Sequence, residues 1–551
     1  MPLKKLNLLV ATATVICVGA LTSLVYLKTA RVRAYTIAES AKFVPDEAMM
    51  ATFISPTPEA IAHLKQFGTP EARTWIAQNL TAFKQKSLAD TSLNFDRDLQ
   101  SWMGGVMVAF LPDEDQQPDQ QESEDFDLLM VIGIKNPIKA WHFARQFNAQ
   151  PDLQRQQRNY KGVEIVEYTE SEGRRYNVAV VDNHVIVAAD PSAIERGIDT
   201  ALGEESLASV TESNQVFLNS VDVPHPILTL YVAEYPTFVK QITSDVSGSS
   251  QLSMQLLSRI KPVESVVLAI GVDRAGIRLK ATTKLNNRAT RQSQQPQLDP
   301  LVTRFPTDTI GLIHTQGIKR IWSEILTISE DNSDLRRLVR QLRRGLNAIN
   351  LDADEDVFGW MDGEFALGLI ASDEGVLAPL GLGGVLMLET SDRAAAERML
   401  AQLDTVVSES NPPVNVEQRK IAGVEVTEWK DPQQGTLFGH GWLQSNLVFI
   451  AFGGPVVEAI TSEPQLPLPA SPRYQNVTEL LPQPNHSYVY LDVEELVTWA
   501  TGYLIAAPAI AVQPNALALV NSVQGLGVSA TRLDSQTARV EMILTLKAKR
   551  N

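Results

Sequence analysis

Two tryptophan-centred stretches decide the fold: LNFDRDLQSWMGG at residues 93–105 and LDADEDVFGWMDG at residues 351–363. Trp102 aligns with Trp360 and Asp98 with Asp356, and both pairs are 258 positions apart. Each stretch leads into an apolar run that is typical of a strand. Because matches that recur in the same order indicate a repeated unit, the two stretches predict an internal duplication.

Other segments repeat in the same order. Phe43-Val44-Pro45-Asp46 corresponds to Phe305-Pro306-Thr307-Asp308, and KGVEIVEY at 161–168 corresponds to AGVEVTEW at 422–429. The second pair predicts strands that are entered through a glycine turn. Each copy also ends in two alternating runs joined by a polar turn, which predicts a terminal hairpin.

The predicted class is α+β: two tandem copies of one domain, mostly antiparallel sheet with helices on one face, preceded by one transmembrane helix. Helices are expected at 58–67, 70–86 and 318–350, the last with a break near Asp331. The predicted organisation is a cytoplasmic tail (1–5), a transmembrane signal anchor (6–27), a juxtamembrane segment (28–42), a first repeat (43–285), a polar linker (286–304) and a second repeat (305–551).

The anchor prediction rests on LNLLVATATVICVGALTSLVYL, residues 6–27, which contain no charged side chain. At about 1.5 Å per residue such a run crosses a hydrocarbon layer of about 30 Å. A cleaved signal peptide is the alternative, but Lys28 and Arg31 lie where small residues would be expected. We therefore expect a single-pass membrane protein whose soluble part lies in a periplasm or a thylakoid lumen.

The Asp-x-x-x-Trp-x-Gly pattern spans Asp98 to Gly104 and recurs from Asp356, with Asp362 in the glycine position and Gly363 one place later. It resembles a family of uncharacterised, usually membrane-anchored bacterial proteins that is common in cyanobacteria. The resemblance implies a thylakoid or plasma membrane setting and supplies no activity or site residue. From the residues themselves, the aspartate is expected to cap a short helix whose tryptophan enters the core.

Composition and motifs favour no catalytic or cofactor chemistry. The net charge of −16 argues against nucleic-acid binding, and the only cysteine, Cys17, lies in the predicted anchor. Residues 352–356 resemble a calcium loop, but Val357 occupies the glycine position. Hydrolase, nucleotide and dinucleotide motifs are missing. We predict no catalytic, cofactor-binding or metal residues, and no cofactor.

Three features occur in one copy only. Residues 113–127 carry eight acidic side chains and predict a solvated loop, and the Ala-rich residues 498–520 predict a helical hairpin interrupted by prolines. Residues 334–350 predict an amphipathic helix, with leucines, valine and isoleucine on one face. Its other face carries the candidate contacts for a partner or a membrane: Arg336, Arg337, Arg340, Arg343 and Arg344.

The leading functional hypothesis is a membrane-anchored extracytoplasmic scaffold or assembly factor that binds another protein without catalysis. A carrier or sensor of an apolar ligand is one alternative. An enzyme whose site is assembled only in space is the other.

Overall fold

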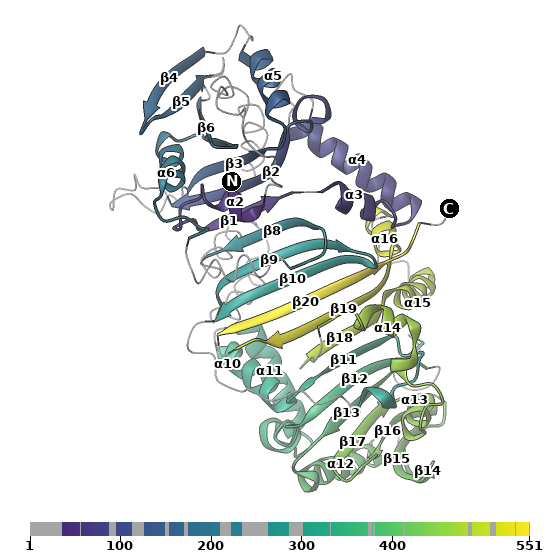
Figure 1. Cartoon of the computed structure of the whole chain (residues 1–551). Coiled ribbons are helices and arrows are strands. Elements are labelled where there is room, and N and C mark those ends of the chain that lie inside the picture. Colours follow the sequence, from purple (N-terminus) through teal and green to yellow (C-terminus); the bar gives the residue numbers. More distant parts are fainter. Residues whose placement is uncertain are drawn as a thin grey trace. The chain divides into compact units, whose positions relative to one another are not determined.

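The computed structural model describes residues 36–55, 57–87, 95–112, 126–148, 154–169, 173, 175–209, 222–233, 263–285, 301–330, 332–372, 377, 381–410, 414–433, 435–482, 487–506, 514–534 and 536–549. The chain divides into two compact units (Figure 1). Unit 1 comprises residues 1–66, 70–274 and 278–289, and unit 2 comprises residues 67–69, 275–277 and 290–551.

The predicted tail and transmembrane helix lie outside the described residues. Among the described residues, none of the helices combines the length and the apolar character that a membrane span requires. The predicted juxtamembrane segment contains α2 (Ile37–Ala41), whose Ile37 and Ala41 are buried in unit 1. The end of the predicted linker forms η3 (Val302–Arg304), and Val302 is buried in unit 2.

Unit 1 is built on a ten-stranded sheet in the order β4-β5-β6-β7-β3-β2-β1-β8-β9-β10. The pairs from β4 to β9 are all antiparallel. The strands are β1 (Met50–Ile54), β2 (Met103–Pro112), β3 (Phe126–Ile134), β4 (Gln154–Tyr160), β5 (Val163–Thr169), β6 (Arg175–Val181), β7 (His184–Ala188), β8 (Pro226–Val232), β9 (Val263–Asp273) and β10 (Gly276–Leu285).

Unit 2 has strands in the order β14-β15-β16-β17-β13-β12-β11-β18-β19-β20, antiparallel throughout. Each strand therefore occupies the place of the strand numbered ten lower in unit 1. The strands are β11 (Gly311–Gln316), β12 (Glu364–Ala371), β13 (Leu382–Glu389), β14 (Asn415–Ile421), β15 (Val424–Asp431), β16 (Gly435–Trp442), β17 (Leu447–Phe452), β18 (Ser487–Asp492), β19 (Val523–Arg532) and β20 (Thr537–Leu546).

The expected glycine turns are present in both units. Lys161 and Gly162 have φ angles of 49° and 89°, and Ala422 and Gly423 have φ angles of 47° and 91°. Two successive positive φ angles match the right-handed twist of the strands that they join. These turns connect β4 to β5 and β14 to β15 with full pairing on either side.

Helices cover both faces of each sheet, so the expectation of helices on one face is wrong. In unit 1, α5 (Pro137–Asn148) packs on one face, while α2 and α6 (Pro191–Leu202) pack on the other. In unit 2, α12 (Arg393–Ser408) and α13 (Gly454–Thr461) belong to separate cores. The physical reason is that successive residues of central strands, such as Val108 and Ala109 in β2, are both buried.

The helices at residues 58–64, 70–87, 318–330 and 333–347 follow the predicted segments closely. Those at 493–506 and 514–520 overlap the predicted helical hairpin at 498–520, and the helix at 472–478 was not predicted. The predicted break near Asp331 separates α10 from α11, and Asn332 caps α11 by accepting hydrogen bonds from the backbone N–H groups of Asp334 and Leu335, both at 3.0 Å. These helices are α3 (Pro58–Leu64), α4 (Pro70–Ser87), α10 (Ile318–Glu330), α11 (Ser333–Asn347), α14 (Pro472–Thr478), α15 (Val493–Ala506) and α16 (Pro514–Val520).

Candidate functional site

The tryptophan motif has the same geometry in the two units. Trp102 is 0% exposed and Trp360 is 1% exposed, so both indoles lie in the core as expected. The indole Nε1 of Trp102 donates to the carbonyl oxygen of Asp98, and that of Trp360 donates to the carbonyl oxygen of Asp356, both at 3.0 Å. The accepting carbonyls lie in short π-helical turns at Phe95–Leu99 and Ala353–Val357.

The capping expectation needs correction in unit 2. Asp352, not Asp356, is the N-cap, and its carboxylate accepts from the backbone N–H groups of Asp354 and Glu355. The Asp356 carboxylate accepts from the Asp352 backbone N–H at 2.8 Å. In unit 1 the Asp98 carboxylate is paired with the side chain of Arg97. Both motif aspartates therefore serve the local structure.

The motif glycines lie at a strand irregularity in unit 1 and at a close backbone approach in unit 2. Gly104 falls within the register shift of β2 between Met103 and Val106. A Cβ atom on Gly363 would lie 2.3 Å from the carbonyl oxygen of Glu389, so the close packing survives in unit 2. Asp362, in the glycine position, instead accepts from the Ser391 backbone N–H at 3.0 Å. The motif is thus a structural junction and holds no free reactive group.

The arginine helix α11 carries two groups of arginines. Arg336 donates through Nε to the carbonyl oxygen of Ser329, and Arg343 pairs with Asp354 at 2.7 Å. Asp354 also accepts from the indole of Trp322 at 2.7 Å. Burial acts to raise the pKa of the Asp354 carboxyl, but these hydrogen bonds outweigh it and hold that pKa below its usual range. These two arginines fasten the helix to its own unit.

The other three arginines point outward. Arg337, Arg340 and Arg344 are exposed, and only Arg337 has an ion pair in the described structure, with Asp334 at 3.6 Å. The predicted apolar face is only partly buried: Val339 is in the core, whereas Leu338 and Leu342 are 60% and 41% exposed. The predicted apolar stripe is therefore covered at Val339 and left exposed at the two leucines.

A strip of aliphatic side chains that are exposed or half-buried crosses each sheet, and we call it the aliphatic row. In unit 2, neighbouring residues pair in register from β12 to β20, and none is fully buried. Its members are Leu367, Ile313, Val489, Val528 and Met542. In unit 1 the members are Val106, Ile54, Leu228 and Ile270, on the strands in the corresponding places.

The central residues of the two rows match in exposure. Ile54 and Ile313 are each 41% exposed, although each lies on a strand with neighbours on both sides. A single exposed aliphatic residue is ordinary, but a contiguous apolar strip marks an interaction surface. The sequence analysis did not predict these rows, because an apolar strand has the same residue pattern whether or not its face is covered by other elements. The signal available in the sequence is an exposed-side isoleucine in each of the corresponding runs 50–54 and 311–316.

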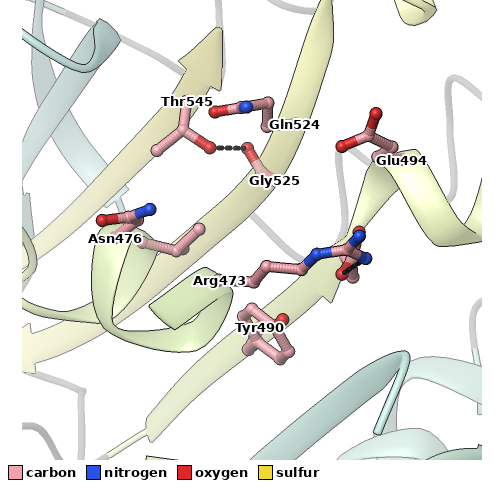
Figure 2. A pocket seen from close by; sticks show the side chains of 9 residues that line it. Arg473, Asn476, Tyr490, Glu494, Gln524, Gly525 and Thr545 are labelled. Atoms are coloured by element: carbon pink, nitrogen blue, oxygen red, sulfur yellow. Dashed lines mark hydrogen bonds and ion pairs between the residues drawn. The ribbon is translucent and has the colours of Figure 1, made fainter. Parts of the chain in front are cut away.

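The cavities described in the two units are polar. Figure 2 shows one of about 70 Å³ in unit 2, where Arg473 pairs with Asp492 at 2.8 Å beside Tyr490 and Thr545. Arg473 also pairs with Glu495 at 2.7 Å. Burial raises the pKa of the Tyr490 hydroxyl. Because these charges satisfy one another, the volume suits water better than an apolar ligand.

A second cavity, of about 350 Å³, lies in unit 1 around Arg196 and is rimmed by carboxylates, including Glu47 and Glu204. Arg196 donates to the carbonyl oxygen of Pro112 at 3.0 Å and pairs with Asp127 at 2.8 Å. Pro112 precedes the predicted acidic loop and Asp127 is its last residue, which the structure places in β3 instead. Residues 113–125 lie outside the described structure. Arg196 therefore holds the two strand ends from which that segment departs.

An ionisable pair occurs in unit 2. His440 Nε2 lies 3.0 Å from Asp404 on α12, and the same carboxylate accepts from the Trp429 indole at 2.7 Å. In unit 1 the corresponding strand and helix bring the Tyr168 hydroxyl to Asn148 at 3.2 Å. Within the described ranges, the hydrogen bonds of His440 reach no nucleophile, and no group of three His, Cys, Asp or Glu side chains could hold a metal ion.

These features define the protein as one of the α+β class, with large antiparallel sheets and helices packed on them. More particularly, the chain belongs to the family described as "Protein of unknown function (DUF3352)", which matches residues 8–546. No curated protein matches the chain.

Solved structures that are distantly similar include two crystal forms of TP0453. "Structure of crystal form I of TP0453" is 10% identical, with a TM-score of 0.27, and the match covers 48% of this chain and 83% of that one. "Structure of crystal form III of TP0453" is 11% identical, with a TM-score of 0.27, covering 47% and 84%. A likeness at this level carries no argument about function.

Proposed function

We propose that the chain is a membrane-anchored extracytoplasmic protein that binds another protein, as a scaffold or assembly factor without catalysis of its own. The aliphatic rows carry this proposal. Their central isoleucines, Ile54 and Ile313, lie on corresponding strands of the two units and are equally exposed. A protein interface would bury this apolar surface, and the burial would be favourable because apolar side chains are transferred out of water.

The anchor and setting belong to the same proposal. The uncharged residues 6–27 support a single membrane-spanning helix, with the soluble part in a periplasm or thylakoid lumen. We further propose that the two units are tandem copies of one ancestral domain. The identical strand order and the repeated tryptophan hydrogen bonds support the duplication. The cyanobacterial setting rests on the sequence resemblance alone.

The test is cross-linking of the tagged full chain in native membranes, followed by identification of co-purified proteins. We expect the double variant Ile54→Lys and Ile313→Lys to recover the partner at least about fivefold less well, because a buried lysine in an apolar interface is strongly unfavourable. The matched control is Leu533→Lys, since Leu533 is 45% exposed and lies outside the rows. Recovery of the bait alone from wild-type membranes would contradict the proposal.

A carrier of an apolar ligand is the second candidate, because the same rows offer apolar surface. Organic extraction of the purified full chain distinguishes the two functions. A lipid-like molecule that is lost in the Ile54→Lys and Ile313→Lys variant would favour the carrier over the scaffold.

A further inference from the structure

The α11 helix presents a surface that its own unit does not use. Its inner side is fixed by Val339, which packs with Trp322 and Ala353, and by the Arg343 pair with Asp354. The Asn332 cap fixes its first turn. The helix is therefore held in one orientation, and its remaining side faces outward.

The outward side combines cations with aliphatic side chains. Arg337, Arg340 and Arg344 are spaced by three and four residues, so they share one helix face. Leu338 and Leu342 are four residues apart and, at about 100° per residue, lie on the opposite edge of the outward side, 60% and 41% exposed. Arginines beside exposed leucines are the composition of helices that lie in the interface of a bilayer.

A bilayer fits this surface better than an acidic protein. Specific recognition of a fixed carboxylate uses a positioned, commonly bidentate arginine, whereas Arg340 and Arg344 have no ion pair to position them among the described residues. Mobile anionic headgroups can follow such unpositioned cations, and the leucines can enter the acyl boundary. Because the whole chain carries a net charge of −16, this cationic face would also decide which side approaches an anionic membrane.

We propose that the outer face of α11 docks on a bilayer surface that contains anionic lipid. The inference rests on the membrane location in the proposed function, and it adds a second, peripheral contact. The predicted N-terminal helix would hold the chain at the membrane, and α11 would orient the soluble part against it.

The test uses the full chain with Cys17→Ser and Gly345→Cys, labelled with an environment-sensitive dye and mixed with vesicles. Gly345 is suited to the label because an added Cβ would meet no atom within 4 Å. We expect a blue shift of the dye emission with phosphatidylglycerol vesicles, at least about threefold larger than with phosphatidylcholine vesicles and reduced by about 0.5 M salt. Retention of the protein on both kinds of vesicle at high salt would separately report insertion of the predicted N-terminal helix.

The charge test replaces Arg337, Arg340 and Arg344 with glutamine, which should abolish the shift on anionic vesicles. The matched control replaces with glutamine three exposed cations elsewhere in unit 2: Arg398, Lys420 and Lys549. This control should retain the emission shift. Leu338→Ser with Leu342→Ser should reduce the shift while folding is preserved. Equal shifts on both lipids, or a shift that survives the arginine replacement, would overturn the proposal. Cross-linking of this face to an acidic protein without any lipid response would also overturn it.

Discussion

Trp360 donates its indole N–H at 3.0 Å to the carbonyl oxygen of Asp356, which lies in the π-helical turn Ala353–Val357. Trp102 and Asp98 form the same hydrogen bond at the same distance in the other unit. Each tryptophan side chain is thereby fixed by core packing and by the hydrogen bond of Nε1, its only polar side-chain atom. The motif that is most visible in the sequence thus fastens a short turn to the sheet.

Replacing Trp360 tests that lock. Trp360→Phe should lower the free energy of unfolding by about 1–2 kcal/mol through the lost hydrogen bond, and Trp360→Ala by about 3–5 kcal/mol through the added cavity. Urea unfolding followed by circular dichroism measures both changes. Trp141→Phe is the control, since Trp141 is half-buried on α5 and its change should stay within about 0.5 kcal/mol. Equal effects of the two Phe variants would show that the hydrogen bond contributes nothing.

Two glycines of unit 2 should respond to alanine with opposite signs. Gly363→Ala places a Cβ 2.3 Å from the backbone oxygen of Glu389, so it should destabilise by about 1–3 kcal/mol. Gly345→Ala adds a methyl group in open space inside α11 and should stabilise by about 0.5–1 kcal/mol. Thermal unfolding of the two variants measures the difference. A stable Gly363→Ala protein would mean that the two backbones can separate without cost.

His184 should make unit 1 sensitive to acid. The imidazole is 4% exposed, and burial lowers its pKa to about 4. Between pH 6.5 and pH 4 the unfolded chain therefore binds a proton that the folded chain does not, so stability falls as the pH falls. The loss through this window is about 3 kcal/mol. Urea unfolding at several pH values should show a smaller acid-induced loss for His184→Leu, and unchanged pH dependence would contradict this assignment.

Much of the fold could be predicted from the sequence because the signals were local. The glycine turns at Gly162 and Gly423 have positive φ angles that few other residues adopt, and the helix break at Asn332 coincides with a cap. The buried tryptophans were also predictable. The placement of helices on both sheet faces was not, because the residues of a central strand are apolar on both sides.

The candidate surfaces could also be predicted only in part from the sequence. Helical periodicity indicated the apolar stripe of α11, but it could not tell that Val339 would be covered while Leu338 remained exposed. That difference depends on which strands and helices of unit 2 lie beside the helix. The His440 pair with Asp404 likewise joins residues 36 positions apart, through a helix and a strand that only the folded sheet brings together.

Arg196 has a consequence for how the protein tolerates change. By binding both Pro112 and Asp127, it closes the base of the acidic segment independently of the residues between them. A contact outside the segment therefore helps to offset the entropic cost of bringing its two ends together. That cost grows only slowly with the length of the segment. Insertions or deletions within 113–125 should leave the pairing of β2 and β3 intact, which makes this segment a natural place for variation or for an engineered tag.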